Sequence, residues 1–477
     1  MNAPAPSPLH HAAFERNRSD AENAIDPINL ERASRENPVP AFSQRAIDHA
    51  AFERFRSNAD NGIDPNNSER ASREKPVPTF SQRALTSDVE TVTLGCRLNM
   101  VESEELARQA KILGETDLAI VNTCAVTAEA LRRSRQAVRR LGRERPAGRI
   151  VVTGCAATLH AADFAAMPGV ARVISNGEKT LAPSAHAPSR AKSAAEGTRG
   201  FLAVQNGCDH RCTFCIIPFG RGASRSAPPD EVLRAARGLV ESGKREIVLT
   251  GVDLTAYGAD LPGGWTLPRL ARRLLAELPD LPRLRFSSID CVEAGFELID
   301  AMAQESRLAP HLHLSLQSGD DLILKRMKRR HSRQDAMDFC RRLREARPET
   351  VLGADLIVGF PTETEEMFQR TLDLVEDCGL THLHVFPFSP WAGAPAAAMP
   401  QVARETIHAR AARLRALGEQ QLQRHLKAQR GKTLRVLAER GGRARAEDFT
   451  LVRTPGAEPG TIFDVRVTGV EGRLLLS

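Results

Sequence analysis

Three cysteines stand close together in the stretch GCDHRCTFCIIPFGRG, residues 207–222. Cys208, Cys212 and Cys215 have the spacing C-x3-C-x2-C, so three thiolates can converge from one short loop. Such a loop can bind three irons of a cubane iron–sulfur cluster and leave the fourth iron free for an exogenous ligand. Alternatively, the loop can bind zinc, with His210 as the fourth ligand of a closed tetrahedron. The spacing favours iron–sulfur, and zinc or unliganded thiols are the alternatives.

Three further cysteines each follow a strand-like apolar run: Cys96 after VETVTLG, Cys124 after LAIVNT and Cys155 after RIVVTG. Helix-like segments separate these runs, and this alternation predicts a parallel α/β sheet. Ligands of open α/β sheets gather at the carboxyl ends of the strands, so the three thiols are expected to meet there. A single cysteine at a strand end usually serves packing. Three at equivalent ends favour a second three-thiolate site.

Residues 200–400 contain six strand-like runs, from FLAVQNGC to LTHLHVFPFSP, separated by segments of helix length. This alternation predicts a complete or partial β/α barrel, in which chemistry is found at the C-terminal ends of the strands. The loop with the C-x3-C-x2-C motif follows the first strand, and four polar residues lie in or just after later ones: Asp253, Ser287, Gln317 and Asp355.

The N-terminal part contains a repeat, because residues 11–47 match residues 49–85 at 28 of 37 positions. Both copies are polar and punctuated by proline, so residues 1–86 are predicted to be a duplicated, mostly disordered extension. The other predicted boundaries are an α/β domain over 87–178, a linker over 179–199, the barrel over 200–400, a basic helix over 401–430 and a small antiparallel β-barrel over 431–477.

The composition fits a multidomain soluble enzyme, with 477 residues, 42% hydrophobic residues and a net charge of +7. We find no apolar run of about 18 residues and no secretory N-terminus, so a cytoplasmic protein with reduced cysteines and no membrane contact is expected. Residues 401–477 carry 15 Lys/Arg against 8 Asp/Glu, a difference of +7. A second basic segment, LRRSRQAVRRLGRER, has seven arginines. Both regions suggest a polyanionic partner.

Taken together, these motifs resemble those of the radical S-adenosylmethionine (SAM) methylthiotransferases. The loop GCDHRCTFCIIPFGRG is similar to their cluster loop, with Phe214 as the aromatic residue before the last cysteine. The resemblance extends over roughly residues 89–477 and includes GCRLNMVES, NTCAVTAEA, VTGCAA, LHLSLQSGDD, ADLIVGFPTETEE and HVFPFSPWAGAPAA. It implies a C-terminal β-barrel of the TRAM type. The chain departs from the family at Cys291, where a proline is usual, and this leaves the local loop geometry open.

The resemblance implies two [4Fe–4S] clusters. Cys208, Cys212 and Cys215 would hold the cluster that binds SAM and generates a 5′-deoxyadenosyl radical. Cys96, Cys124 and Cys155 would hold an auxiliary cluster that carries the transferred sulfur, and a second SAM would supply the methyl group. Phe214 is expected to flank the adenine of SAM, while Gln317 and Ser318 either line its ribose and methionine or only form hydrogen bonds at the barrel end. The resemblance assigns no catalytic side chain.

The motifs GCRLN, NTCAVTAEA and HVFPFSP are most similar to the branch that converts N6-threonylcarbamoyladenosine at position 37 of tRNA to its 2-methylthio derivative. The branches acting on N6-isopentenyladenosine in tRNA or on a ribosomal-protein aspartate are alternatives. The resemblance implies two partners, the tRNA anticodon stem-loop and a low-potential electron donor of the flavodoxin or ferredoxin type. From the residues alone, an RNA-binding protein with two structural zinc sites is the non-enzymatic alternative.

Overall fold

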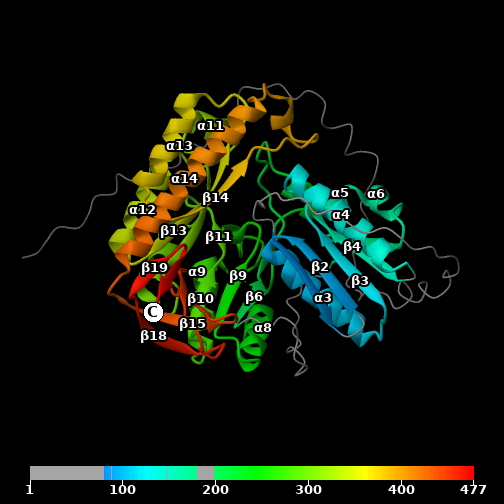
Figure 1. Cartoon of the computed structure of the whole chain (residues 1–477), viewed down its shortest axis with the longest axis horizontal. Helices are drawn as coiled ribbons and strands as arrows, with labels where there is room; N and C mark the ends of the chain where they lie inside the picture. The colour runs from blue at the N-terminus through cyan, green and yellow to red at the C-terminus, as the bar shows by residue number, and fades with distance from the viewer. Residues whose placement is uncertain (1–79, 87–88, 147, 180–197) are drawn as a thin grey trace, which may run out of the picture. The chain divides into compact units, whose positions relative to one another are not determined.

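A computed structural model describes residues 80–86, 89–146, 148–179 and 198–477 (Figure 1). The first sheet has five strands in sequential order. They are β1 (Phe80–Thr86), β2 (Val89–Gly95), β3 (Leu118–Thr123), β4 (Arg149–Gly154) and β5 (Val170–Ile174). The pairings from β2 to β5 are all parallel, which confirms the predicted open α/β sheet.

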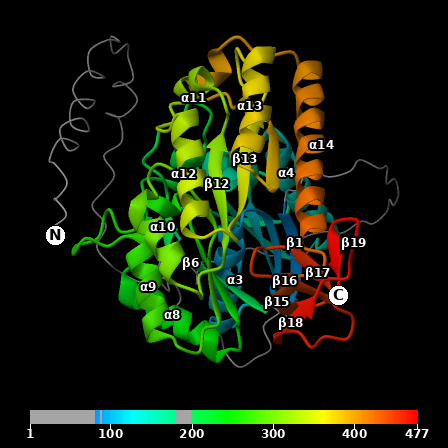
Figure 2. The same ribbon diagram turned by 90° about the vertical axis from the view of Figure 1, so that its left-hand side faces the viewer.

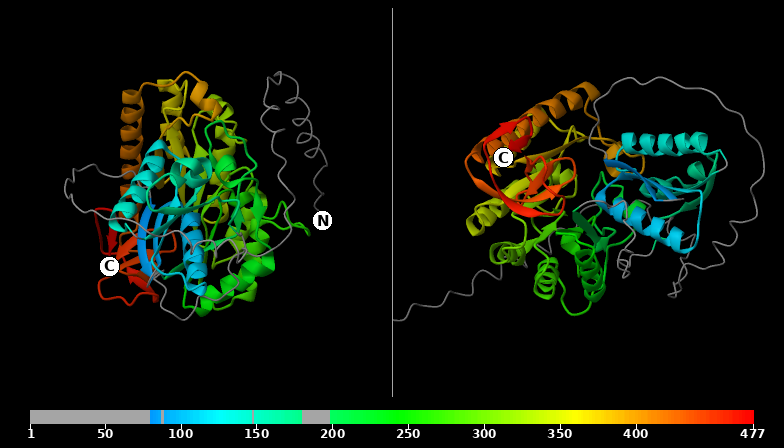
Figure 3. Two further views of the ribbon diagram at one scale, coloured as in Figure 1. Left: turned by 90° about the vertical axis from the view of Figure 1, so that its right-hand side faces the viewer. Right: turned by 60° about the horizontal axis from the view of Figure 1, so that its bottom comes forward.

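Helices connect these strands on both faces of the sheet, as Figure 3 shows for the two longest. They are α3 (Arg97–Ile112), α4 (Ala128–Glu144), α5 (Cys155–Leu159) and α6 (Ala161–Ala165). The helix α4 begins where the Thr127 hydroxyl accepts the backbone N–H of Ala130, and its buried stripe includes Val138 and Leu141. Apolar residues on one side of the helix thus cover the sheet.

The N-terminal extension is predicted to run to residue 86, but its last seven residues belong to the first sheet. Residues 80–86, the end of the second repeat copy and the residue after it, form β1, which pairs antiparallel with β2 over its whole length. The physical reason is that β2 would otherwise present an unpaired edge, and an added strand satisfies its backbone groups. The rest of the predicted extension lies outside the described residues, as does the predicted linker except for its ends.

The central part of the chain forms an arc of parallel strands. One sheet has the order β10-β9-β6 and the next β11-β12-β13-β14, and every pairing is parallel. Only Ser287 separates β10 from β11, and its N–H donates to Leu249 O at 3.0 Å. The arc therefore has six successive strand runs and is the predicted partial β/α barrel. Its strands are β6 (Arg199–Ala203), β9 (Glu246–Thr250), β10 (Arg283–Phe286), β11 (Ser288–Ile289), β12 (His311–Gln317), β13 (Val351–Val358) and β14 (His382–Pro387).

Helices cover the outer face of this arc, and Figure 2 shows several of them in front of β12 and β13. They are α8 (Pro229–Glu241), α9 (Leu267–Glu277), α10 (Gly295–Gln304), α11 (Asp321–Arg326), α12 (Arg333–Ala346) and α13 (Glu365–Asp377). Along β12, Leu312, Leu314 and Leu316 are fully buried in the core beneath these helices. Because successive side chains alternate across a strand, His313, Ser315 and Gln317 face the other way.

The C-terminal residues form a long helix and a six-stranded sheet with the order β18-β15-β16-β17-β20-β19. Four of the five strand pairings are antiparallel as predicted, whereas β17 and β20 are parallel. Closure of this sheet into a barrel stays a prediction. The elements are α14 (Arg404–Ala428), β15 (Thr433–Glu439), β16 (Arg443–Ala446), β17 (Leu451–Arg453), β18 (Ile462–Arg466), β19 (Gly469–Glu471) and β20 (Leu474–Leu476).

The helix α14 packs on two hydrophobic cores. Ala411 and Leu414 belong to the barrel core, whereas Leu422 and Leu426 belong to the core of the C-terminal sheet. A fully buried charged group adds a polar connection, because Arg283 pairs with Glu246 at 3.3 Å and also donates to backbone oxygens of β15 and β16. The C-terminal sheet is therefore held against the barrel by one helix and by a buried cation.

Replacing Leu426 with alanine should detach the C-terminal sheet more easily. Leu426 has no exposed area and packs in the core of this sheet. A buried leucine truncated to alanine typically costs about 2–5 kcal/mol. Urea unfolding combined with limited proteolysis would show earlier cleavage within residues 433–476. The matched control is Leu322→Ala, whose side chain is 44% exposed and should change little; equal stability of the two variants would contradict the packing described.

Candidate functional site

The first cysteine trio lies at one edge of the N-terminal sheet. Cys96, Cys124 and Cys155 directly follow β2, β3 and β4, which are neighbouring parallel strands, so the three residues lie at the same edge of the sheet. Gly95 has φ +101°, and a Cβ there would lie 2.8 Å from Cys124 Cβ and 2.9 Å from its Sγ. A glycine before the first cysteine is thus required both by the backbone angle and by the closeness of the second thiol.

Burial changes the pKa values of two of these thiols. Cys124 and Cys155 are buried and Cys96 is exposed. Burial, with the nearby thiols adding to it, raises the pKa of Cys124 to about 12, and burial also raises the pKa of Cys155. The free thiols of Cys124 and Cys155 are therefore protonated at neutral pH, and a bound metal must displace their protons. A trio with two buried sulfurs and one exposed sulfur can enclose one side of a cluster and leave another side accessible.

The second trio occupies the loop after β6 and the short strand β7 (Gln205–Asn206). The backbone N–H of Cys208 donates to Gly222 O at 3.1 Å and closes this loop. Its thiol contacts Asp253 Oδ2 at 3.4 Å, and the N–H of Ile217 donates to Cys215 Sγ at 3.4 Å. Since Asp253 comes just after β9, the loop lies at the C-terminal ends of the barrel strands, as the sequence predicted.

Arg329 connects the second trio to the barrel interior. Its guanidinium is nearly buried, donates to Asp290 Oδ2 at 2.5 Å and to Ser315 O at 2.7 Å, and reaches Cys212 Sγ at 3.8 Å. Charge-assisted bonds of this kind orient metal ligands and balance the negative charge of thiolates. The pattern of types and spacing in the sequence gave no signal for this residue, which lies 117 positions from the cysteine it contacts.

The three thiols of each trio are not gathered as closely as the ligands of one zinc ion. In the described part of the chain, neither cysteine trio is among the groups whose ligand atoms all lie within 4.8 Å of one another. Sulfurs of a tetrahedral zinc site lie only roughly 3.8 Å apart, given a Zn–S distance of about 2.3 Å. His210, the possible fourth zinc ligand, lies 3.2 Å from Asp253 Oδ2 and 3.2 Å from Glu293 Oε1, and the ligand atoms of Cys208, His210 and Asp253 all lie within 4.8 Å of one another. In a cubane cluster each of three thiolates binds a separate iron, so the thiols need not surround one ion.

The two trios belong to segments that pack against each other. The side-chain amide of Asn176 donates to Gly220 O at 2.6 Å and lies 3.6 Å from Cys155 Sγ. Ile216, the residue after the second trio, joins the hydrophobic core of the N-terminal sheet. The helix α5, which begins at Cys155, contacts α7 (Ile217–Arg221). The loop of one trio is therefore fixed on the edge that carries the other.

The buried side chain of Arg221 adds an ionic link at this contact. Its guanidinium donates to Glu102 Oε1 at 2.7 Å, to Asn206 Oδ1 at 2.9 Å and to Asn99 Oδ1. It also lies 4.0 Å from Cys96 Sγ. Lys179 approaches the other oxygen of Glu102 at 2.6 Å, and together these charges lower the pKa of Glu102 to about 2 despite its burial. Arg221 thus touches both segments.

The residues predicted to contact SAM lie in different surroundings. Phe214 packs edge-to-face on Phe360, with ring centroids 6.4 Å apart. The hydroxyl of Ser318 is buried and accepts the N–H of Asp320 at 3.2 Å, so it already has a structural role. Gln317 ends β12 with φ +67°, and among the described residues its amide has no hydrogen-bond partner. A left-handed angle at a non-glycine residue often marks a functional position.

The basic helix α4 is largely neutralised within the protein. Five of the seven arginines in this helix and the residue after it form ion pairs. The pairs are Arg132 and Arg133 with Glu129, Arg135 with Asp163, Arg140 with Glu144, and Arg145 with Asp117. Exposed pairs of this type add little stability, but they reduce the positive field of the helix. The interpretation of this segment as a polyanion-binding face therefore loses most of its support.

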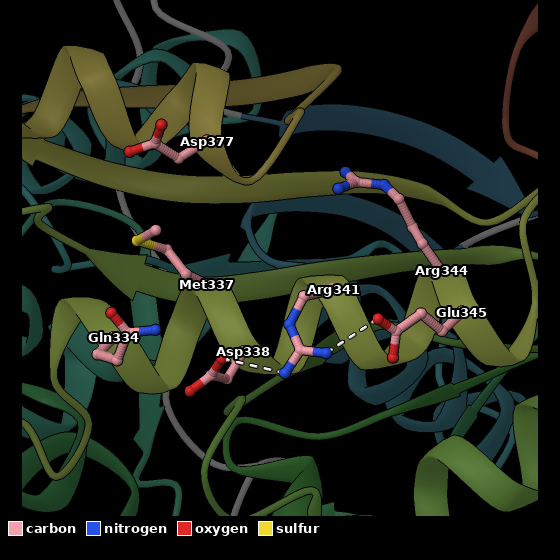
Figure 4. A pocket seen from close by; sticks show the side chains of 7 residues that line it. All are labelled: Gln334, Met337, Asp338, Arg341, Arg344, Glu345 and Asp377. Atoms are coloured by element: carbon pink, nitrogen blue, oxygen red, sulfur yellow. Dashed lines mark hydrogen bonds and ion pairs between the residues drawn. The ribbon is translucent and has the colours of Figure 1, made fainter.

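A surface depression lies over α12 and the end of α13 and contains none of the predicted site residues (Figure 4). In it, Arg341 pairs with Asp338 at 3.3 Å and with Glu345 at 2.9 Å. Its lining is completed by Gln334, Met337, Arg344 and Asp377. Self-paired charges on the outer helices offer no convergent reactive groups, so the chemistry is expected at the cysteine-bearing ends of the strands.

Comparison with known families also places the two cysteine trios in two different regions of the chain. Residues 202–375 match the radical SAM superfamily, and residues 88–175 match the "Uncharacterized protein family UPF0004". The first match contains the second cysteine trio, and the other contains the first trio. The fold and site therefore define a radical SAM enzyme, which implies a [4Fe–4S] cluster and SAM as cofactors. The second trio, three free thiols on one loop, has the donor set that such a cluster needs.

Relatives with assigned names show to which group of radical SAM enzymes the chain belongs. The chain is 44% identical over 400 residues to the threonylcarbamoyladenosine tRNA methylthiotransferase MtaB of Rickettsia prowazekii, covering 80% of this chain and 95% of that protein. It is 33% identical to MtaB of Bacillus subtilis, with 76% and 86% covered. It is 35% identical to a tRNA-2-methylthio-N(6)-dimethylallyladenosine synthase of Cereibacter sphaeroides, with 79% and 94% covered. The chain belongs to the radical SAM tRNA methylthiotransferases, in the family of MtaB. Among its described helices, none has the length and apolar character to cross a bilayer.

Replacing Arg221 with methionine should destabilise the contact between the two trios. The substitution leaves Glu102 buried without its strongest partner, and removing one member of a buried pair typically costs about 3–5 kcal/mol. Hydrogen exchange should show faster opening of residues 97–112 and 217–221. The control Arg143→Met alters an exposed arginine of α4 and should leave exchange unchanged. Equal protection in both variants would show that Arg221 does not hold these segments.

Proposed function

We propose that this protein transfers a methylthio group to C2 of N6-threonylcarbamoyladenosine at position 37 of tRNA. The observation that carries the proposal is the packing of two three-thiol sites against each other, one on each family-matched region. In this proposal Cys208, Cys212 and Cys215 bind the [4Fe–4S] cluster that activates SAM. Cys96, Cys124 and Cys155 bind a second [4Fe–4S] cluster that carries the sulfur. The 44% identity to a protein named for this modified nucleoside supports the choice of substrate.

The chain's own residues position and shield the reacting groups. When bound, the SAM-binding cluster supplies the electron for reductive cleavage of SAM. Arg329 orients Cys212 and balances thiolate charge, whereas Asp253 accepts a hydrogen bond from the Cys208 thiol and so orients it in the protonated state. Gln317, whose φ is positive and whose amide has no partner among the described residues, binds a polar group of SAM in this proposal. Phe214 contributes an apolar wall that it shares with Phe360. Ser318 acts through its loop rather than by contact.

The proposed macromolecular partner is the anticodon stem-loop of tRNA. Six exposed cations on the C-terminal helix and sheet form no ion pair among the described residues: Lys427, Arg430, Lys432, Arg435, Arg443 and Arg466. Unpaired surface cations of this kind contact phosphates and supply affinity without sequence information. The choice of nucleoside then falls to the barrel interior. The proposal includes a low-potential flavodoxin- or ferredoxin-type electron donor and action in the cytoplasm.

Single cysteine variants should separate the two proposed clusters. Cys208→Ala is expected to lose about half of the iron and all reductive cleavage of SAM, because its thiol belongs to the cluster that binds SAM. Cys124→Ala should lose a similar amount of iron, retain SAM cleavage and lose methylthio transfer. Anaerobic iron analysis and detection of 5′-deoxyadenosine would measure both effects. The control Cys340→Ala changes a buried cysteine outside both trios and should keep all the iron. Full iron content in Cys124→Ala would refute the second cluster.

The substrate is tested by mass spectrometry of tRNA nucleosides. In a strain deleted for this gene, 2-methylthio-N6-threonylcarbamoyladenosine should disappear and its unmodified precursor should accumulate. Re-expression of the wild type should restore it, whereas Cys208→Ala should not. Loss of the methylthio derivative of N6-isopentenyladenosine instead, with the threonylcarbamoyl product unchanged, would assign the activity of the dimethylallyladenosine relatives to this chain.

A further inference from the structure

Two histidines and one aspartate meet inside the barrel, on three neighbouring strands. His313 lies on β12, Asp355 on β13 and His384 on β14, and the ligand atoms of the three side chains all lie within 4.8 Å of one another. Asp355 and His384 are direct partners in the parallel register, whereas His313 is paired with Gly353. The group involves none of the six clustered cysteines.

The distances fit coordination of one metal ion. Asp355 Oδ1 lies 2.8 Å from His313 Nε2 and 3.1 Å from His384 Nδ1. Adjacent ligands of an octahedral ion lie roughly 3.0 Å apart, since bonds from a first-row metal to nitrogen or oxygen are about 2.1 Å long. The same carboxylate oxygen faces both imidazoles, and the two rings are 4.4 Å apart. Two imidazoles and one carboxylate on one side of an ion leave further positions open.

The strand beneath the group is built to admit a histidine ring. Gly353 lies beside both histidine-bearing strands, and a Cβ there would approach His313 Nδ1 to 2.7 Å. Only a residue without a side chain leaves room for the ring in this orientation, which directs Nε2 toward Asp355. The glycine is therefore a second structural feature, in addition to the distances, that supports a ligand-binding site. A cluster formed by chance would not require glycine as its neighbour.

The charge and exposure of the group also suit a cation. The side chains of His313, Asp355 and His384 are 12%, 24% and 56% exposed, so an ion can enter from the His384 side. The group combines one carboxylate with two imidazoles, and Asp355 Oδ1 is the oxygen that faces both rings.

The group is close to the reactive end of the barrel but separate from it. His313 precedes Ser315 by two residues, a rise of roughly 7 Å along a strand. Ser315 O accepts a hydrogen bond from Arg329, which reaches Cys212 of the second trio. We propose that His313, Asp355 and His384 form a binding site for a divalent first-row transition metal, with its open positions directed to the barrel interior. The proposal does not rest on the identity of the modified nucleoside.

The site is tested with zinc on the anaerobically reconstituted holoenzyme, so that the cysteines are already occupied. After dialysis against Zn²⁺, the wild type should retain one zinc per chain in addition to its iron. Asp355→Asn and His384→Ala should lose this zinc, and Gly353→Ala should bind it about 10- to 100-fold more weakly, as expected when a ligand is misoriented. X-ray absorption at the zinc edge should show two imidazole nitrogens and oxygen ligands.

The matched control is His408→Ala, which removes an exposed histidine of α14 and should leave the zinc content unchanged. His384 is mostly exposed, so its replacement should preserve the fold, and an unchanged circular dichroism spectrum and melting temperature would verify this. The proposal is overturned if the wild type retains no stoichiometric zinc, if Asp355→Asn and His384→Ala keep it, or if sulfur dominates the zinc ligands. Because the readout is metal content, a negative result leaves the tRNA assay unaffected.

Discussion

The relative position of the two thiol sites depends on the buried guanidinium of Arg221. Its side chain has no exposed area, and its donors reach Glu102 and Asn99 on α3 as well as Asn206 beside the second trio. Burial alone would lower its pKa, but the neighbouring Glu102 raises it well above the ordinary value, so the charge is retained. Neither segment alone provides this environment. The two sites must therefore be assembled together, because each supplies groups that the other leaves unsatisfied.

The cysteine positions could be predicted because they follow local rules. Each cysteine of the first trio follows an apolar strand-like run, and parallel strands bring their carboxyl ends to one edge whatever the rest of the fold is. The spacing of the second trio is local as well. Arg221 and Arg329 could not be predicted, since their partners lie up to 125 and 117 positions away. The strand β1 was missed because its pairing fills an edge that the repeated sequence does not reveal.

The number of basic residues in a segment indicated its surface charge less well than the ion pairs in the structure do. The helix α4 has many arginines, yet Glu129 alone pairs with two of them, and Asp163 on another helix pairs with a third. In the part of the chain that the structure describes, the C-terminal region retains cations without an ion pair at the end of α14 and on β15, β16 and β18. Only the structure distinguishes these cases, because ion pairing depends on which elements are adjacent.

The open arc of strands explains why the barrel interior is polar. A closed eight-stranded barrel is filled by branched apolar side chains from its own strands. Here six strand runs leave one side open, and the inward positions of β12, β13 and β14 hold His313, Ser315, Gln317, Asp355 and His384 instead. Polar groups in such a place cost desolvation energy unless a ligand or a partner satisfies them. The interior is therefore a surface for ligands, and its polarity follows from the missing strands as directly as the thiol sites follow from the strand ends.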